Sequence, residues 1–420
     1  MTSTAAPSTL AAGPDVQRRI LKVLVASQVL SGAGLAAGIT VGALLAQDML
    51  GTTGLAGLPS ALFTAGSALA AIGVGRISQA RGRRPGLAAG YLTGAVGSAG
   101  VLAAAGLGSP VLLFIALFVY GAGTATNLQA RYAGADLAAP THRARAVSTV
   151  LVATTLGGVV GPNLAAPTGD LAAALGIPRL AGPFLLAGAA YAAAAVVLAL
   201  WLRPDPLLLA RTLAEAEQDP TVSPAQARPA VEGAPAKPRG GVVLGALVMI
   251  LTQLVMVAVM TMTPVHMHDH GHGTAASGLV IAIHVGAMYL PSPLTGRLVD
   301  RYGRIALAAA SGVTLLVAGL VAAVAPGDSI ALLALALALL GLGWNFGLVS
   351  GTAIITDAVP LATRAKTQGM VDVSIAIAGA TGGLASGIVV DLAGYPVLAL
   401  TGGVLALAVL PAIAVTAHSR

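Results

Sequence analysis

The sequence predicts an all-α membrane protein in which twelve transmembrane helices form two pseudo-symmetric six-helix halves. Composition is the first reason. Of 420 residues, 56% are hydrophobic and only 9% are charged, whereas about a quarter of a soluble domain is charged. The mean hydropathy of +0.89 agrees with this. The length and number of the apolar runs, and a repeat between the two halves of the chain, are the other reasons.

The same composition excludes several classes of protein. A soluble enzyme or a nucleic-acid-binding protein needs a charged, wetted surface, so the 22 Lys and Arg against 15 Asp and Glu do not indicate a nucleic-acid partner. The chain contains no cysteine, which excludes disulfide frameworks, thiolate metal sites and cysteine nucleophiles. We therefore expect the lipid bilayer to surround most of the chain.

Twelve apolar runs are long enough to cross a bilayer. A hydrocarbon core of roughly 30 Å needs about 20 apolar helical residues per crossing, and the runs lack the alternation of barrel strands. We predict the spans at 21–47, 54–75, 86–107, 110–135, 146–167, 180–202, 242–265, 276–296, 305–325, 329–355, 367–391 and 394–416.

The remaining segments divide the chain into domains. Residues 1–17 are polar and predict a disordered N-terminal tail. Residues 204–241 are rich in proline, alanine and charge, which is a linker composition, and within them 207–217 predicts an amphipathic turn or two. The predicted domains are therefore an N-terminal six-helix half (18–203), a cytoplasmic linker (204–241) and a C-terminal six-helix half (242–420).

The basic residues test this count, because Lys and Arg accumulate in the cytoplasmic loops of membrane proteins. With twelve spans, every one of the 22 Lys and Arg residues except Arg179 falls on the same side of the membrane. A wrong number of spans would scramble this alternation. We therefore predict a multi-pass protein of the plasma (inner) membrane with both termini in the cytoplasm.

The two halves repeat each other at a separation of 221 residues. Six pairs of loop residues align in this register: Gly75 with Gly296, Gly82 with Gly303, Arg83 with Arg304, Asp136 with Asp357, Arg143 with Arg364 and Arg145 with Lys366. All of them lie in the predicted cytoplasmic loops after the second and fourth spans of each half. Paired six-helix halves are how many secondary transporters build a midplane site that opens alternately to two sides.

One of these loops carries a complete motif. The pattern G-x-x-x-D-R-x-G-R is matched by Gly296, Asp300, Arg301, Gly303 and Arg304. This is the loop motif of the major facilitator superfamily, which the chain resembles over essentially its whole length. The first-half copy keeps Gly75 and Arg83 but has Gln79 and Ala80 in place of the Asp and Arg. The less specific antiporter signature of the fifth span is matched by Gly157, Gly161 and Pro162.

The resemblance implies a transporter that works by alternating access, and it implies that the loop is a gating latch. Asp300 stands at a span end, where a helix N-terminus and cations such as Arg143 or Arg145 would hold a carboxylate. This contact would stabilise the outward-open state and break when the halves rock. Gln79 carries no charge, so we expect a weaker latch in the first half. The alternative is that these charges only set the topology.

A methionine and histidine pattern on the seventh and eighth spans suggests a substrate. Met256 and Met260 share one helical face, and His284 and Met288 have the same i,i+4 spacing. Neutral sulfur and imidazole ligands suit Cu(I). The pattern resembles the copper-importer branch of the superfamily, which implies that these four residues bind copper as the transported substrate. An outer capture loop would then be formed by His266, His268, His270 and His272.

The alternative substrate is a small organic molecule. Methionine is also a flexible apolar filler, and the resemblance extends to relatives that move flavin-like molecules. The chain would then be a proton-coupled transporter or exporter of a drug, metabolite or flavin-like solute, which the fifth-span motif favours. Ionisable groups within spans are functional candidates, and we predict Asp372, Asp136 and Arg131 as candidates for proton coupling, with Arg131 able to form an internal ion pair.

Other classes of function lack a motif. The sequence has no H-E-x-x-H pattern, no phosphate loop and no intramembrane Ser–His or Asp–Asp constellation, so we do not expect an enzyme. A receptor would normally add a signalling domain larger than 204–241. We therefore predict a monomeric transporter of a small molecule or metal ion, with no nucleic-acid partner and no resident cofactor.

Overall fold

The computed structural model describes residues 14–50, 58–217 and 238–418, and these residues are almost entirely α-helical, with no strand among them. Ten helical stretches of this described part are long and apolar enough to cross a membrane. The helices at the first and fifth predicted span positions, Pro14–Leu50 and Arg143–Asn163, pack in the same bundle as these ten. Every predicted span is therefore represented by a helix. The all-α membrane fold class is thereby confirmed.

The N-terminal half fills six positions in the bundle. Its helices are α1 (Pro14–Leu50), α2 (Leu58–Arg81), α3 (Arg83–Leu107), α4 (Pro110–Ala135), α5 (Arg143–Asn163), α6 (Ala165–Ala174) and α7 (Gly182–Trp201), with the short 3₁₀ turns η1 (Pro140–His142) and η2 (Arg179–Ala181). α5 and α6 together take the fifth position. The predicted span 110–135 coincides with α4, which begins at a Ser109 cap that accepts from Leu112 N–H.

The C-terminal half repeats this arrangement. Its helices are α9 (Pro238–Asp269), α10 (Thr274–Tyr289), α11 (Ser292–Tyr302), α12 (Arg304–Val324), α13 (Ile330–Ala358), α14 (Arg364–Ala393), α15 (Tyr395–Ala406) and α16 (Val409–His418). The eighth position is divided between α10 and α11, and the twelfth between α15 and α16. Pro291 lies at the first of these breaks. Proline interrupts a helix because it lacks an N–H and its ring clashes with the preceding turn.

Three predicted boundaries are wrong. α1 begins at Pro14, so residues 14–17 are helical rather than part of a disordered tail, and 1–13 lie outside the described residues. The predicted linker contains a helix of twelve residues, α8 (Pro206–Glu217), instead of a turn or two, while 218–237 lie outside the described residues. α8 is stable because it buries Leu207 and Ala210 and packs on α3 and α4.

The third correction concerns the histidine-rich segment. α9 continues to Asp269, so His266 and His268 belong to a helix and not to a loop. The helix ends where Gly271 adopts φ +82°, a conformation that glycine reaches without strain. The backbone N–H of His272 then donates to Met267 O at 3.0 Å and closes the turn.

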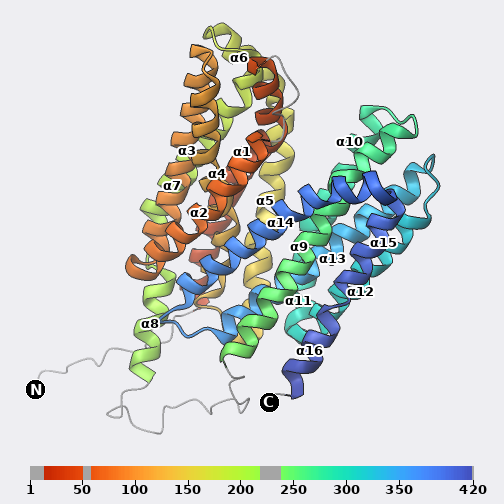
Figure 1. Cartoon of the computed structure of the whole chain (residues 1–420). Helices are drawn as coiled ribbons and strands as arrows, with labels where there is room; N and C mark the ends of the chain where they lie inside the picture. The colour runs from red at the N-terminus through yellow and green to blue at the C-terminus, as the bar shows by residue number, and fades with distance from the viewer. Residues whose placement is uncertain (1–13, 51–57, 218–237, 419–420) are drawn as a thin grey trace, which may run out of the picture.

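Each half has an apolar core, the core of the C-terminal half also includes Ala135, Ala144, Val147 and Leu151 of the N-terminal half, and the halves meet mainly along α2–α14 and α5–α11. Figure 1 shows that the halves converge at the end carrying α8 and α11 and diverge toward the end carrying α6 and α10. We call the first the basic end, because it carries Arg83, Arg143 and Arg304, and the second the opposite end. With the predicted orientation, the end at which the helices diverge would face outward.

Candidate functional site

A buried ion pair joins the two halves. Arg131 on α4 donates through Nη2 to Asp372 Oδ1 on α14 at 2.7 Å, and the two side chains are 0% and 3% exposed. The Tyr132 hydroxyl lies 3.3 Å from the same Oδ1, and Arg131 Nε donates to Thr352 Oγ1 at 3.1 Å. Among the described residues, Asp372 Oδ2 is buried without a hydrogen-bond partner. Two of the three predicted coupling residues therefore meet, although 241 positions separate them.

The third coupling candidate, Asp136, lies in a different cluster at the basic end. Arg83 Nε donates to Asp136 Oδ2 at 2.7 Å, and Arg83 Nη2 donates to Gln368 Oε1 at 2.5 Å. Arg364 of the other half lies 4.0 Å from Asp136. Asp136 thus belongs to the contacts that close the basic end rather than to the pair at Asp372.

The sequence repeat produces a matching cluster in the second half. Asp357 forms ion pairs with Arg304 of its own half and with Arg143 of the other half. Arg304 Nη2 also donates to Pro140 O at 2.7 Å. Each of the two repeated aspartates therefore lies between one arginine of its own half and one of the opposite half.

Asp300 of the complete loop motif lies at the N-terminus of α5. Its Oδ1 accepts from Ala144 N–H at 3.2 Å and its Oδ2 from Arg145 N–H at 3.1 Å. Arg145 Nε lies 3.7 Å away. A carboxylate at this position interacts favourably with the helix dipole and with the free N–H groups of the first turn. Arg301 does not join this contact, because its guanidinium lies over the Tyr302 ring at 5.3 Å.

Gln79 makes the equivalent contact in the first half, although its side chain carries no charge. Its Oε1 accepts from Ala365 N–H at 2.8 Å and Lys366 N–H at 3.4 Å, at the N-terminus of α14. Its Nε2 donates to Leu361 O at 3.3 Å and Ala362 O at 2.6 Å. The amide forms both acceptor and donor bonds, whereas a carboxylate can only accept.

Glycines of the motif permit this close contact between halves. A Cβ added at Gly75 would lie 2.9 Å from Ala365 O, and one added at Gly296 would lie 2.6 Å from Ser148 Oγ. Gly303 has φ +93°, which separates α11 from α12. The loop motif therefore contributes both close approach and a sharp turn at the basic end.

The antiporter-like residues lie on α5, near the end of that helix. A Cβ on Gly157 would collide with the backbone of α1 at Val29 and Ala33, so this glycine lets the two helices touch. Gly161 and Pro162 fall within the last turn of α5, which ends at Asn163. The fifth span changes direction immediately after this signature.

Three of the four predicted copper ligands are buried, and Met260 is half-buried. α9 packs mainly against α14 and α13, and α10 packs mainly against α13, so the two helices have little contact with each other. Met256 and Met288 belong to one apolar core cluster, with Met260 at its margin. His284 is fully buried, and its Nδ1 donates to Leu337 O at 2.8 Å. Its Nε2 has no partner among the described residues.

The four outer histidines do not converge on one point. The His266 ring stacks on Tyr395 with centroids 4.4 Å apart, and the His270 ring lies 4.3 Å from His266. His270 Nδ1 and His272 Nε2 each bond to a backbone carbonyl, and His268 is exposed. No group of three His, Asp or Glu residues within the described ranges could hold a metal ion. The structure therefore gives the capture loop no metal-binding geometry.

A polar and aromatic group on the C-terminal half lies outside the predicted site residues. Trp344 Nε1 on α13 donates to Gln253 Oε1 on α9 at 2.8 Å. The Tyr289 ring on α10 meets Trp344 edge to face, with centroids 5.6 Å apart. Aromatic residues make up only 3% of the chain. This rarity was the only feature of the sequence that could have drawn attention to Tyr289.

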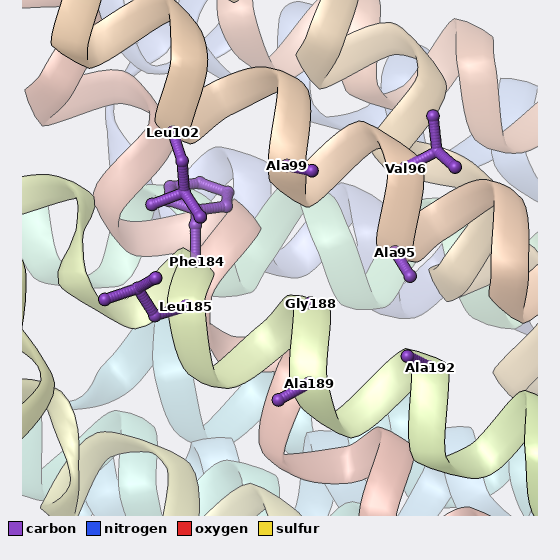
Figure 2. Close-up of a pocket in the computed structure, with 9 residues that line it drawn as sticks. All are labelled: Ala95, Val96, Ala99, Leu102, Phe184, Leu185, Gly188, Ala189 and Ala192. Atoms are coloured by element: carbon purple, nitrogen blue, oxygen red, sulfur yellow. The ribbon is translucent and has the colours of Figure 1, made fainter.

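A shallow apolar groove of about 440 Å³ lies elsewhere, on the outside of the N-terminal half (Figure 2). It runs between α3 and α7 and is lined by residues such as Val96, Ala99, Leu185 and Gly188. Val96 is 61% exposed. Since no polar group lines it, this groove has the character of a lipid-facing surface and not of a solute site.

Comparison with known proteins decides the family. A family model described as the Major Facilitator Superfamily matches residues 24–291 and again residues 245–419. The chain belongs to the major facilitator superfamily. The chain is 57% identical to the uncharacterized MFS-type transporter YdeG of Bacillus subtilis (strain 168), over 95% of this chain and 92% of that protein.

Two further similarities extend across the superfamily. The chain is 31% identical to the riboflavin transporter RfnT of Brucella anthropi, over 84% of this chain and 85% of that protein. The human organic anion transporter MFSD10 (TETRAN) has a similar structure, with a TM-score of 0.74 and 18% identity over 94% of this chain and 99% of that chain. This second likeness shows the fold alone. Neither similarity supports the copper-importer branch.

Proposed function

We propose that this superfamily member is a secondary active transporter that moves a small organic molecule across the plasma membrane by alternating access, driven by protons. The Arg131–Asp372 pair carries the proposal, because it is buried and joins α4 of one half to α14 of the other. Transfer of a proton to Asp372 removes its charge and leaves Arg131 without its partner. The contact between halves then weakens, which favours rocking.

The other contacts between the halves support a rocking mechanism. They gather at the basic end, where Asp300 caps α5 and Gln79 caps α14, and the helices diverge at the opposite end (Figure 1). A set of polar contacts of this kind breaks and re-forms more readily than an apolar core. The riboflavin transporter among the relatives supports an organic solute.

The test begins with a thermal-shift screen of the purified chain against flavins, common antibiotics, Cu(I) and Zn(II). The solute that shifts the melting temperature is then loaded into proteoliposomes with an imposed pH gradient. We expect Asp372→Asn to abolish accumulation driven by the gradient, because asparagine cannot carry the proton. Asp391→Asn, an exposed acid on the same helix, is the matched control and should accumulate solute normally.

Two results would oppose the proposal. Full gradient-driven accumulation by Asp372→Asn would show that the ion pair has no role in proton coupling. Stabilisation of the wild-type chain by metal ions alone would exclude an organic solute as the substrate. In contrast, loss of accumulation with retained solute exchange in Asp372→Asn would separate coupling from binding, as the proposal requires.

Copper is a second candidate on one observation. The Nδ1–H of His284 is held by a backbone carbonyl, which leaves Nε2 as a buried lone pair without a partner in the described chain. Histidines that bind metals are usually oriented in this way. Met288 follows one turn later on α10. The comparisons give copper no support, and the organic solute is the better-supported substrate.

A further inference from the structure

The structure contains a half-buried polar and aromatic group that the ion pair and the latch do not use. It consists of Gln253, Tyr289 and Trp344, which come from α9, α10 and α13. We infer that these three side chains form a binding subsite for an uncharged planar heterocycle rich in hydrogen-bond acceptors. The inference deepens the proposed function, on which it rests, by naming the class of solute.

The group shares a helix with the surroundings of the ion pair that joins the halves. Thr352, which accepts from Arg131 Nε at 3.1 Å, lies on α13 about two helical turns from Trp344. Tyr289 and Gln253 are only half-buried, whereas Trp344 is 4% exposed. Gln253 and Tyr289 are therefore the members that a solute between the halves could touch, and Trp344 lies behind them.

Trp344 fixes the orientation of both neighbours. Its indole N–H donates to Gln253 Oε1 at 2.8 Å, which occupies the acceptor of the amide and leaves the Nε2 hydrogens to donate. Its ring meets Tyr289 edge to face at an interplanar angle of 71°, a favourable geometry for aromatic pairs. The Tyr289 ring is thus held in place as a flat surface on which another ring can stack.

Both exposed members present unused donors. Within the described residues, no acceptor bonds to Gln253 Nε2, and none bonds to the Tyr289 hydroxyl. On the facing helix α14, Gly379 has no side chain, and a Cβ there would lie 3.2 Å from Gln253 Nε2. The Gln253 amide therefore lies close to the α14 backbone at Gly379. Two donors beside an aromatic face suit a flat ligand with ring carbonyls or ring nitrogens.

The electrostatics favour an uncharged ligand. α10 carries no formal charge, and the charged residues of α9 and α13 lie only near their helix ends. Arg131 and Asp372 neutralise each other. A charged solute would therefore lose its hydration without meeting an opposite charge, which is costly in a low-dielectric interior.

The chain provides its own reporter for the test. It has two tryptophans, and Trp201 is 52% exposed at the end of α7. Trp201→Phe leaves Trp344 as the single indole. We expect riboflavin, a planar uncharged probe with ring carbonyls, to quench Trp344 fluorescence saturably in the purified full-length chain. Proflavine, a planar cation without carbonyls, should bind at least about tenfold more weakly.

Variants of the subsite make the assignment specific. In the Trp201→Phe background, Gln253→Met keeps the length of the side chain but removes the donor, and Tyr289→Leu removes the ring. Each should raise the Kd for riboflavin about tenfold or more. Tyr289→Phe keeps the stacking surface and should bind more tightly than Tyr289→Leu. Phe346→Leu is the control, because it removes a ring from the opposite face of α13 and should leave Kd unchanged.

The results separate this inference from the proposed function. Absence of saturable quenching, tighter binding of proflavine, or an unchanged Kd in both Gln253→Met and Tyr289→Leu would each overturn the subsite. Binding is measured without an ion gradient, so failure of the Asp372→Asn transport test would remove the proton-driven function and leave the subsite intact. Size-exclusion profiles equal to that of the parent protein confirm that each variant is folded.

Discussion

The neighbours of a single residue decide what its side chain can do in this membrane protein. An aspartate at the depth of Asp372 is costly unless it is paired, and Arg131 at 2.7 Å supplies the pairing. Removal of one member of such a buried pair typically costs about 3–5 kcal/mol. Met256, which has similar burial, has only apolar neighbours in its core cluster. The burial of Asp372 and Met256 does not by itself reveal their roles. The residues that each side chain contacts must also be known.

The methionines allow a test at the residue scale. Met256→Leu combined with Met260→Leu removes both sulfurs at nearly constant volume, a change that costs less than about 1.5 kcal/mol per site. Because Met256 lies in the apolar core, we expect transport of the organic solute and the melting temperature to change little. Met249→Leu, on the same helix, is the control. Loss of cellular copper uptake in the double variant but not in the control, measured by elemental analysis, would contradict this and establish copper as a substrate.

At the scale of elements, one carboxylate ties α8 to the first-half loop. Asp205 accepts from Arg84 N–H at 2.7 Å and from Leu207 N–H at 3.0 Å, so it caps α3 and α8 together. Arg211 on α8 donates to Gln79 O at 2.9 Å. The helix α8, which lies between the halves, is therefore bonded directly to the loop that contains Gln79.

The glycines of the two loops test this attachment. Gly82 and Gly303 have φ of +98° and +93° with ψ of 168° and 154°, a region that is essentially restricted to glycine, so alanine at either position costs about 1–3 kcal/mol of backbone strain. A Cβ at Gly82 would also collide with the Asp205 carboxylate, whereas nothing lies within 4 Å of one at Gly303. We expect Gly82→Ala to lower the melting temperature more than Gly303→Ala does.

The control for this comparison is the same substitution in an Asp205→Ala background. The extra loss at Gly82 should shrink there, since the clashing carboxylate is absent. Equal melting temperatures for Gly82→Ala and Gly303→Ala in the otherwise unchanged chain would show that α8 is not tightly held at this loop.

At the scale of the whole molecule, we propose that the closure of the basic end sets the conformation. Asp300 holds α5 and Gln79 holds α14 in pseudo-symmetric positions, one through a charge and the other through an amide. Asp357 adds an ion pair between the halves. Because these contacts are polar and lie at one end, we expect them to stabilise one position of the two halves relative to each other.

This arrangement predicts a measurable shift in conformation. The chain has no native cysteine, so spin labels at Leu175→Cys and His268→Cys report the separation of the halves at the opposite end by double electron–electron resonance. We expect Gln79→Ala combined with Asp300→Ala to add a population with a shorter distance. Asp15→Ala, which breaks an exposed ion pair within α1, should leave the distances as they are. Unchanged distances in the double variant would mean that the latch does not set the state.

Much of the fold could be predicted because hydrophobicity acts locally along the chain. A run such as 110–135 must be helical and membrane-embedded whatever its neighbours are, since its backbone has to bond to itself in lipid, and α4 has these bounds. α8 was predicted too short, because its apolar face is stable only against α3 and α4. The helical extension of α9 through His268 depended likewise on where a glycine ends the helix.

The sequence by itself determined the membrane class, the twelve spans, the repeat between the halves and the residues of the loop motif. Only the tertiary structure decided the partners: Asp372 with Arg131, Gln79 with the N-terminus of α14, and Gln253 with Trp344. The physical reason is the distance over which each interaction acts. Transfer of apolar residues into lipid depends on neighbours in sequence, whereas ion pairs and hydrogen bonds act over a few ångströms between atoms that only the packing of the helices brings together.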